Sequence, residues 1–295
     1  MKEQIKAFAK INIHLDIKSK REDGFHDVEM IMQSVSLCDD VSVTLTEDAS
    51  FCAECNIAEV PTGDKNIAVR AARLFAERAS LKQGAKISIE KRIPMAAGLA
   101  GGSTDAAAVL VAMNRLCSNR FSYDELCDMA ASLGSDVPFC ISGGIVYSEG
   151  RGEILTPFLP IPSDTVLVIA CGGEGVSTPW AYGLMDREFN DFVDYKTKGV
   201  ADIEETLRSN EPEGFYRHLF NIFEAPVMAH RPAVSQMREV MLAHGANAAM
   251  MSGSGPSVFG VFNSQAQAEA AKKELSELGY FACVCAPEPT RKIEK

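Results

Sequence analysis

The segment PMAAGLAGGSTDAAAVLVAM, residues 94–113, restricts the possible folds of this chain more than any other. An alternating apolar segment, KISIEKRI at residues 86–93, precedes it and predicts a strand. Three glycines fall among residues 98–102, and the alanine-rich run after them predicts a buried helix over residues 103–116. Glycines let a backbone approach a ligand closely, and the N–H groups of a helix N-terminus attract anions. The order strand, glycine loop and helix therefore favours a phosphate-binding site.

Two common nucleotide-binding motifs do not fit this loop. A P-loop requires a lysine directly after its glycines, and none follows here. A dinucleotide-binding fingerprint requires a different glycine spacing, and Pro94 ends the preceding strand. A tight turn that serves only helix packing stays an alternative. Within the predicted helix, Asp105 could cap the first turn or lie near a metal ion.

The composition is that of a globular protein and argues against several classes of partner. The chain has 295 residues, which favours about two domains. Its formal net charge of −11 argues against general binding to nucleic acid or to anionic membranes, so an anionic ligand must be held by local donors. We find no signal peptide and no membrane-spanning run, and the nine cysteines lack zinc-site spacing. We therefore expect a cytoplasmic protein with reduced thiols.

Hydrophobic patterns predict an α+β first half. Residues 4–17 alternate strictly and predict a half-buried strand, with Lys10, Asn12, His14 and Asp16 on its polar face. Further strands are predicted at 41–47 and 51–57, and helices at 66–79 and 122–134.

The second half predicts a smaller α+β unit. Two prolines place a domain boundary near Pro160, with a fresh strand at 165–170 and short helices around 201–222. The elements that follow are helix 233–245, strands 246–255 and 256–262, helix 264–279 and strand 280–286. This order of helices and strands suits a ferredoxin-like sandwich.

Five segments occur in an order that resembles the GHMP kinases, a family of small-molecule kinases. They are AFAKINIHLDI, REDGFHDVEMIMQS, PMAAGLAGGSTDAA, LGSDVPFC and MSGSGPSVFG, and together they extend over nearly the whole chain. The resemblance implies a two-domain α+β fold. Its N-terminal domain would be ribosomal-protein-S5-like with a left-handed βαβ crossover, here residues 1–160, and its C-terminal domain ferredoxin-like, here 161–295.

The resemblance implies that ATP and Mg²⁺ are the cofactors. The glycine loop would surround the ATP phosphates, and Asn66 would border the adenine, which gives the expected cofactor-binding residues Pro94, Met95, Ala96, Ala97, Gly98, Leu99, Ala100, Gly101, Gly102, Ser103, Thr104 and Asn66. Ser103 is the expected magnesium ligand. Because alanine resists positive φ, we expect ordinary backbone angles at Ala96, Ala97 and Ala100.

The resemblance also implies a catalytic pair, Asp136 and Lys10. A carboxylate can accept the proton of an attacking alcohol, and a nearby ammonium keeps it ionised and offsets negative charge in the transition state. Asn12 lies on the same strand face as Lys10 and is expected to bind substrate. The alternatives are that Asp136 only caps the turn GSDVP and that Lys10 is a solvated strand lysine.

The segment DGFHDVE resembles the substrate signature of family members that act on a cytidine diphosphate-linked methylerythritol. It implies that Phe25 stacks on cytosine and that His26 hydrogen-bonds the base edge, with Tyr182 as a second stacking residue. Simple packing on a short helix, with Thr178 as its N-cap, is an equal alternative for Tyr182. The other histidines, 14, 218, 230 and 244, are expected at surface or hydrogen-bonded positions.

The implied reaction is ATP-dependent phosphorylation of the 2-hydroxyl of that substrate, in non-mevalonate isoprenoid precursor biosynthesis. The alternatives are a kinase of the homoserine or mevalonate type and a non-catalytic nucleotide-binding protein on the same fold. Gly253 and Gly255, in the segment SGSGPSVFG, are weaker candidates for the floor of the active site. We expect no nucleic-acid or membrane partner.

Overall fold

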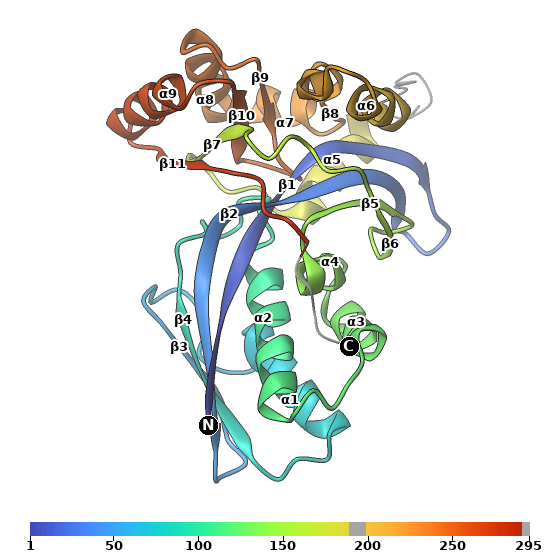
Figure 1. Cartoon of the computed structure of the whole chain (residues 1–295), viewed down its shortest axis with the longest axis vertical. Coiled ribbons are helices and arrows are strands. Elements are labelled where there is room, and N and C mark those ends of the chain that lie inside the picture. Colours follow the sequence, from blue (N-terminus) through green and yellow to red (C-terminus); the bar gives the residue numbers. More distant parts are fainter. Residues whose placement is uncertain (189–198, 291–295) are drawn as a thin grey trace.

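Two long antiparallel strands form the centre of the first sheet (Figure 1). The structure is a computed structural model that describes residues 1–188 and 199–290. Strand β1 (Lys2–Lys20) pairs along its length with β2 (His26–Thr46). The sheet continues as β3-β4-β2-β1-β8, with β3 (Phe51–Cys55), β4 (Gly84–Glu90) and β8 (Phe220–Asn221). The other end of β2 pairs with β5 (Ile145–Glu149), which pairs with β6 (Ile154–Pro157).

Four helices lie beside this sheet: α1 (Ile67–Arg78), α2 (Gly101–Leu116), α3 (Tyr123–Leu133) and α4 (Val137–Ser142). The α2 helix is central, and every residue from Thr104 to Asn114 is buried. Its small alanines allow β1 and α1 to pack against it. The Asn66 and Ser122 side chains cap α1 and α3, because each accepts a backbone N–H group of the first turn of its helix.

The second sheet is four-stranded, in the order β11-β7-β10-β9. Its strands are β7 (Val166–Cys171), β9 (Ala248–Met251), β10 (Val258–Phe262) and β11 (Phe281–Cys285), and its helices are α8 (Pro232–Ala243) and α9 (Gln265–Glu277). Along the chain these elements run βαββαβ, so the expected ferredoxin-like arrangement is confirmed. Between β7 and α8 lie α5 (Thr178–Glu188), α6 (Gly199–Arg208), a 3-10 helix (Pro212–His218) and α7 (Glu224–His230).

The expectation that β1 is half-buried is confirmed from Gln4 to Ala7, where exposed and buried residues alternate, and is wrong from Ala9 to Ile17, which are all buried. Lys10, Asn12, His14 and Asp16 are each 5% exposed or less. The second half of the chain covers this polar face: β8 pairs with β1 in parallel, and the Asn12 N–H donates to Ser252 Oγ over 3.3 Å. The division at residues 160 and 161 stays a prediction, although β8 shows that the first sheet includes a strand from beyond it.

Within the described residues, none of the helices has the length and apolar character needed to cross a membrane.

Candidate active site

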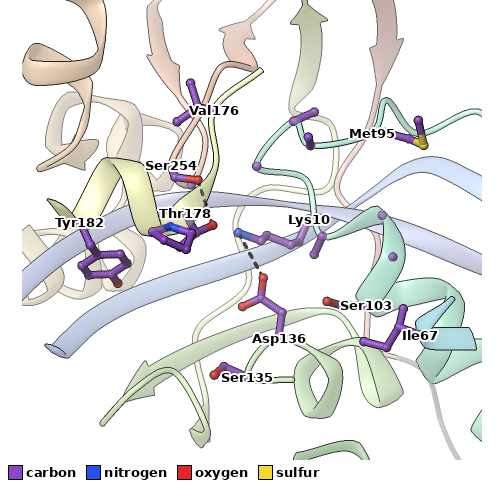
Figure 2. Close-up of a pocket in the computed structure, with 18 of the residues that line it drawn as sticks. Lys10, Ile67, Met95, Ser103, Ser135, Asp136, Val176, Thr178, Tyr182 and Ser254 are labelled. Atoms are coloured by element: carbon purple, nitrogen blue, oxygen red, sulfur yellow. Dashed lines mark hydrogen bonds and ion pairs between the residues drawn. The ribbon is translucent and has the colours of Figure 1, made fainter. Parts of the chain in front are cut away.

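A cavity of about 950 Å³ lies where the two halves of the chain meet (Figure 2). This volume is within the usual range for small-molecule sites, roughly 300–1,000 Å³. Most of the expected site residues line it: Lys10, Asn12, Phe25, His26, Asn66, Asp136, Tyr182, and the glycine loop at Pro94–Gly98 and Ala100–Ser103. The structure thus brings together segments separated by up to 244 residues of sequence, from Lys10 to Ser254.

Two residues of the glycine loop do not line the cavity, contrary to expectation. Leu99 is 1% exposed and packs in a hydrophobic cluster, while its carbonyl accepts the Lys10 N–H over 3.2 Å. Thr104 is 2% exposed and lies inside the first turn of α2. Leu99 therefore anchors the loop to β1 through its carbonyl group, and Thr104 is packed within α2. Both side chains lie on the side of the loop away from the cavity.

The glycine loop adopts left-handed backbone at two alanines, which corrects the expectation of ordinary angles. Ala96 has φ 51° and Ala100 has φ 57°, and Ala100 is the N-cap of α2. The helix begins at Gly101, two residues before the expected start. Left-handed backbone costs a non-glycine residue about 1–2 kcal/mol, and such strain gathers at functional sites because surrounding contacts can enforce it.

The segment at residues 252–255 packs closely against the glycine loop at Gly98, which lies between the two alanines. A Cβ on Gly98, whose φ is +73°, would lie 2.3 Å from the Ser252 carbonyl oxygen. Ser252 Oγ donates to the Gly98 carbonyl over 3.3 Å. Gly253 lines the cavity as expected, whereas Gly255 does not. The close approach of these two backbones fixes the loop, and it requires glycine at Gly98.

Lys10 and Asp136 face each other across the cavity floor (Figure 2). Lys10 is 5% exposed, so it is not a solvated strand lysine. Its Nζ donates to Asn12 Oδ1 over 2.6 Å and lies 3.9 Å from Asp136 Oδ2. Asp136 occupies the N-cap position of α4, but its side chain makes no capping hydrogen bond. The carboxylate therefore points at the lysine and the cavity and does not serve as a cap.

At the other end of the cavity lie His26 and three aromatic residues, Tyr182, Phe223 and Phe25. The Tyr182 ring stacks on the His26 ring at 4.8 Å between centroids and 28° between planes. Phe223 meets Tyr182 edge-on at 4.9 Å. Phe25 is 54% exposed, and the Arg151 guanidinium lies 5.0 Å from its ring centroid. Tyr182 thus both packs and lines the cavity, and burial, with the charge of Asp136, raises its pKa to about 12.

Asn66 and Thr178 both line the cavity at the start of a helix, but only Asn66 caps its helix. Asn66 lines the cavity but holds the start of α1, because its Oδ1 accepts the Ala68 N–H and its Nδ2 donates to the Pro61 carbonyl, each within 2.9 Å. At α5, Ser177 and not Thr178 caps the helix, through a 3.3 Å bond from the Trp180 N–H. Thr178 Oγ1 instead lies 3.3 Å from Ser254 Oγ and joins two walls of the cavity.

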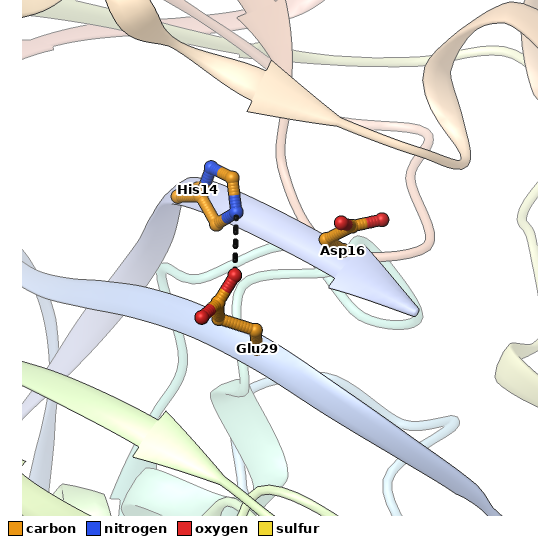
Figure 3. A group of neighbouring side chains, drawn as sticks. All are labelled: His14, Asp16 and Glu29. Carbon is orange, nitrogen blue, oxygen red and sulfur yellow. Dashed lines mark ion pairs between the residues drawn. The ribbon is translucent and has the colours of Figure 1, made fainter. Parts of the chain in front are cut away.

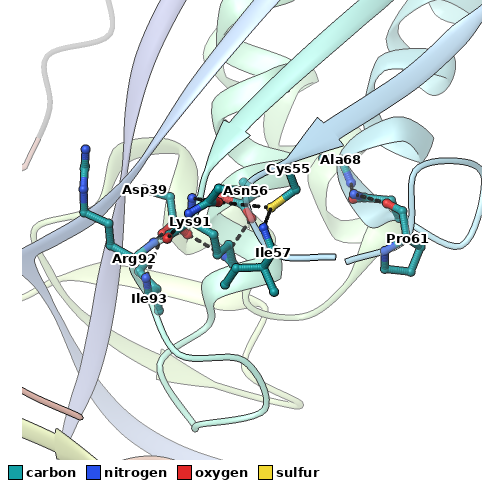
Figure 4. Close-up of polar contacts among 11 residues, drawn as sticks. Asp39, Cys55, Asn56, Ile57, Pro61, Ala68, Lys91, Arg92 and Ile93 are labelled. Atoms are coloured by element: carbon teal, nitrogen blue, oxygen red, sulfur yellow. Dashed lines mark hydrogen bonds and ion pairs between the residues drawn. The ribbon is translucent and has the colours of Figure 1, made fainter. Parts of the chain in front are cut away.

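A buried ion triad that was not predicted from the sequence lies beneath the glycine loop, and Figure 4 shows two of its members, Lys91 and Asp39. The Lys91 ammonium pairs with Asp39 and with Asp105, the latter at 2.8 Å, and all three side chains are 5% exposed or less. Asp39 Oδ1 also accepts the N–H groups of Arg92 and Ile93. The triad therefore joins β2, the start of the loop and the first turn of α2.

Asp105 does not cap the helix, and its carboxylate pairs with the Lys91 ammonium. Burial raises the pKa of Asp105 to about 7, although the Lys91 charge acts to lower it. A signal for Lys91 was present in the sequence: in KISIEKRI it shares a strand face with the apolar Ile87, Ile89 and Ile93. A lysine on an apolar face requires a buried acidic partner.

His14, Asp16 and Glu29 form a second cluster, at the domain junction (Figure 3). His14 is fully buried, and among the described residues neither ring nitrogen has a hydrogen-bond partner; Nε2 lies 3.8 Å from Glu29 Oε2, the pair marked in Figure 3. The expectation of a surface or hydrogen-bonded histidine is therefore wrong there. The Lys18 ammonium lies 2.8 Å from Glu29 and 3.7 Å from Asp16. Lys18 therefore balances the charge of these carboxylates.

The cavity also offers oxygen ligands for a divalent cation. Ser103 lies in the first turn of α2 and lines the cavity, as does the Asp136 carboxylate, which is 35% exposed. Mg²⁺ prefers oxygen ligands and commonly completes its shell with phosphate oxygens and water. The Ser103 hydroxyl and the Asp136 carboxylate, both beside the glycine loop, fit this preference.

Two family descriptions match the chain. The N-terminal domain of GHMP kinases matches residues 66–144, and the C-terminal domain of GHMP kinases matches residues 203–280. Among similar proteins, 4-diphosphocytidyl-2-C-methyl-D-erythritol kinase of Alkaliphilus oremlandii is 38% identical over 272 residues, which are 92% of each chain. The enzyme of the same name from Clostridium perfringens is 40% identical over 271 residues, 91% of each chain.

Solved structures agree with these matches. A crystal structure of 4-(cytidine 5'-diphospho)-2C-methyl-D-erythritol kinase superposes with a TM-score of 0.75 at 32% identity, over 96% of this chain and 99% of that one. A homoserine kinase from Cytophaga hutchinsonii superposes with a TM-score of 0.77 at 19% identity, over 98% and 95% of the two chains. The second likeness shows a shared fold alone.

Proposed function

The chain belongs to the GHMP kinase family, and from this premise we propose that it transfers the γ-phosphoryl group of ATP to the 2-hydroxyl of 4-diphosphocytidyl-2-C-methyl-D-erythritol. The observation that carries the proposal is the Lys10–Asp136 pair between the glycine loop and the aromatic cluster of Phe25, His26 and Tyr182. One cavity thus has a phosphate end, a reactive centre and an end for a planar base.

The glycine loop would hold the ATP triphosphate. Gly98 to Ser103 present backbone N–H groups at the start of α2, where the helix dipole adds about half a positive charge. These donors are needed because the chain has a net charge of −11 and both substrates are anionic. Asn66 and its neighbours would border the adenine.

Asp136 would act as the general base and Lys10 as its electrostatic partner. The substrate hydroxyl gives its proton to the Asp136 carboxylate while its oxygen forms a bond to the γ-phosphorus. The bond from that phosphorus to the β-phosphate oxygen breaks, and ADP leaves with the electron pair. Lys10, held by Asn12 and 3.9 Å from Asp136, offsets the negative charge that develops on the transferred group.

Magnesium would be held by Ser103, with Asp136 as the other oxygen donor near the phosphates. When bound, it neutralises charge on the β- and γ-phosphate oxygens. Asn12 and Lys10, and not the metal ion, would align the acceptor, because both side chains are fixed on a buried strand face.

The aromatic cluster would bind the cytidine end of the acceptor. Phe25 offers an exposed ring face, and His26 lies beside it on the same hairpin. Base stacking on such a ring contributes on the order of 1–3 kcal/mol. A kinase for homoserine or mevalonate has no base to place there.

The test is ADP formation, measured in a coupled assay with a panel of alcohols. We expect turnover with 4-diphosphocytidyl-2-C-methyl-D-erythritol, none above background with homoserine or mevalonate, and competitive inhibition by CMP. Turnover with one of the other alcohols, or ATP binding without transfer to any of them, would contradict the proposal. Phe25→Ala should raise the KM for the acceptor and leave the KM for ATP unchanged.

A further inference from the structure

His26 is held on two sides by one face of the α5 helix. Tyr182 and Asp186 are four residues apart on α5, so they project from the same side of the helix. Tyr182 lies against the face of the imidazole ring, and Asp186 Oδ1 lies 2.9 Å from Nε2 at its edge. Stacking alone would allow either of the two ring orientations related by a 180° flip about the Cβ–Cγ bond, and the carboxylate selects the one that places Nε2 beside it.

Asp186 also reaches the strand beside His26. Lys20 and His26 are direct partners across the β1–β2 hairpin. The Lys20 ammonium donates to Asp186 Oδ2 over 2.6 Å, while Asp186 Oδ1 is the oxygen that is hydrogen-bonded to His26 Nε2. Burial acts to raise the pKa of Asp186, but the bonds from Lys20 and His26 outweigh it and lower that pKa. The group is therefore an ionised acceptor at neutral pH, and it joins α5 to both strands of the hairpin.

An ionised carboxylate at this distance can only accept, so it places the proton of His26 on Nε2. Nε2 is then committed to Asp186 and does not donate to a bound base. Any contact of the His26 side chain with the base uses Nδ1. His26 is 7% exposed, and both it and Asp186 line the cavity.

We propose that Asp186 is a positioning residue for the pyrimidine end of the acceptor site, fixing the proton and the plane of His26 through its carboxylate. This inference rests on the proposed function, since it gives His26 a cytidine ligand to bind. It adds a residue outside the sequence motifs: Asp186 has the ordinary appearance of an acidic residue on a helix. Its action is on acceptor binding, because it is ion-paired to the hairpin and not to Lys10 or Asp136.

The first experiment determines which ring nitrogen of His26 carries the proton. Long-range ¹H–¹⁵N correlation spectra of the ¹⁵N-labelled protein, with His26 assigned by comparison with His26→Gln, show which ring nitrogen is protonated. We expect Nε2 to be protonated in the natural sequence and the Nδ1–H form to become populated in Asp186→Ala. An unprotonated Nε2 in the natural sequence, or an unchanged spectrum in the variant, would overturn the inference whatever the enzyme's activity.

The second experiment separates binding from chemistry. Asp186→Ala should raise the acceptor KM and the CMP inhibition constant together, by about tenfold, because a charge-assisted hydrogen bond is lost. The kcat and the KM for ATP should stay within about threefold. Asp186→Asn, whose carbonyl can still accept, should recover part of the loss. Thermal melting of each variant checks that it is folded.

Asp27→Asn is the matched control, because Asp27 is the next residue after His26 and pairs with Arg21 and Ser19. It should leave the CMP inhibition constant within about twofold. An Asp186→Ala variant that binds CMP as the natural sequence does would refute the role of Asp186. Failure of the natural protein itself to bind CMP would instead refute the proposed function, so the two failures are distinguishable.

Discussion

Two buried lysines beside the glycine loop differ in how their charge is balanced. Lys91 contacts two buried carboxylates, Asp39 and Asp105. Lys10 has an amide oxygen at 2.6 Å, and its carboxylate, Asp136, is 3.9 Å away and partly exposed. Lys91 is therefore neutralised within the fold, while the charge of Lys10 is available to a ligand. We infer a structural role for the first and a catalytic role for the second.

Replacement of each lysine by methionine tests this distinction. Lys91→Met leaves two carboxylates buried without a cation, so we expect a loss of about 3–5 kcal/mol in the free energy of unfolding. Lys10→Met should cost less stability and lower kcat by at least about a hundredfold. Urea unfolding and the ADP assay measure the two effects. Equal stability losses in the two variants would contradict the distinction.

The raised pKa of Asp105 predicts a pH dependence of stability. Because this pKa rises from 3.8 in the unfolded chain to about 7, the folded protein holds the proton more tightly. The resulting stabilisation is complete below about pH 4 and is lost as the pH rises to 7. Asp105→Asn cannot ionise, so its free energy of unfolding should improve relative to the natural sequence between pH 5 and 7.5, on the order of 1–3 kcal/mol. A difference that does not change with pH would refute the assignment.

At the scale of elements, local patterns predicted α1, α2, α3, α8 and α9 to within two residues at each end, but they missed the first part of β2 and the short elements α4, β8 and α7. The α1 and α3 helices and their caps follow from Asn66, Ser122 and the periodicity after them. The left-handed backbone of Ala96 and Ala100 could not be predicted from their residue types, and the contact of the intervening Gly98 with Ser252 involves a segment far along the chain. The same holds for the Asp39–Lys91–Asp105 triad, whose members lie on three different elements.

The packing of the glycine loop predicts different tolerances at two of its glycines. A Cβ at Gly98 would meet the Ser252 carbonyl at 2.3 Å with φ at +73°, whereas one at Gly102 would meet Ile67 at an ordinary 3.6 Å. We expect Gly98→Ala to raise the KM for ATP at least about tenfold by displacing the loop, and Gly102→Ala to leave it within about threefold. Steady-state kinetics measure both values. A tolerated Gly98→Ala would show that the contact with Ser252 does not shape the site.

At the scale of the whole molecule, the two halves interlock. The β8 strand completes the first sheet beside β1, and residues 286 and 288 hydrogen-bond to β2 near Ser34 and Ser36. The sequence predicted the α+β class and the order of the second sheet, but the alternation in β1 predicted a half-buried strand and did not show that the second half of the chain covers its polar face. That face carries Lys10 and Asn12, and it is buried because the second half completes the cavity.

Truncation tests this interlocking. A fragment of residues 1–160 lacks β8 and the 252–255 segment, so the polar face of β1 would be exposed. We expect the fragment to unfold at lower urea concentration than the full chain and to bind a hydrophobic dye. The full chain should unfold with coincident fluorescence and circular dichroism transitions. A fragment as stable as the full chain would contradict the account.

The central claim is that Asp136 takes the proton of an alcohol held between Lys10 and the γ-phosphate. The most direct measurement is single-turnover transfer from γ-labelled ATP to 4-diphosphocytidyl-2-C-methyl-D-erythritol by the natural sequence and by Asp136→Asn. The account predicts transfer to the 2-hydroxyl by the natural sequence, and a rate constant lower by about two to four powers of ten in a variant that still binds both substrates. A near-normal rate in Asp136→Asn would contradict it.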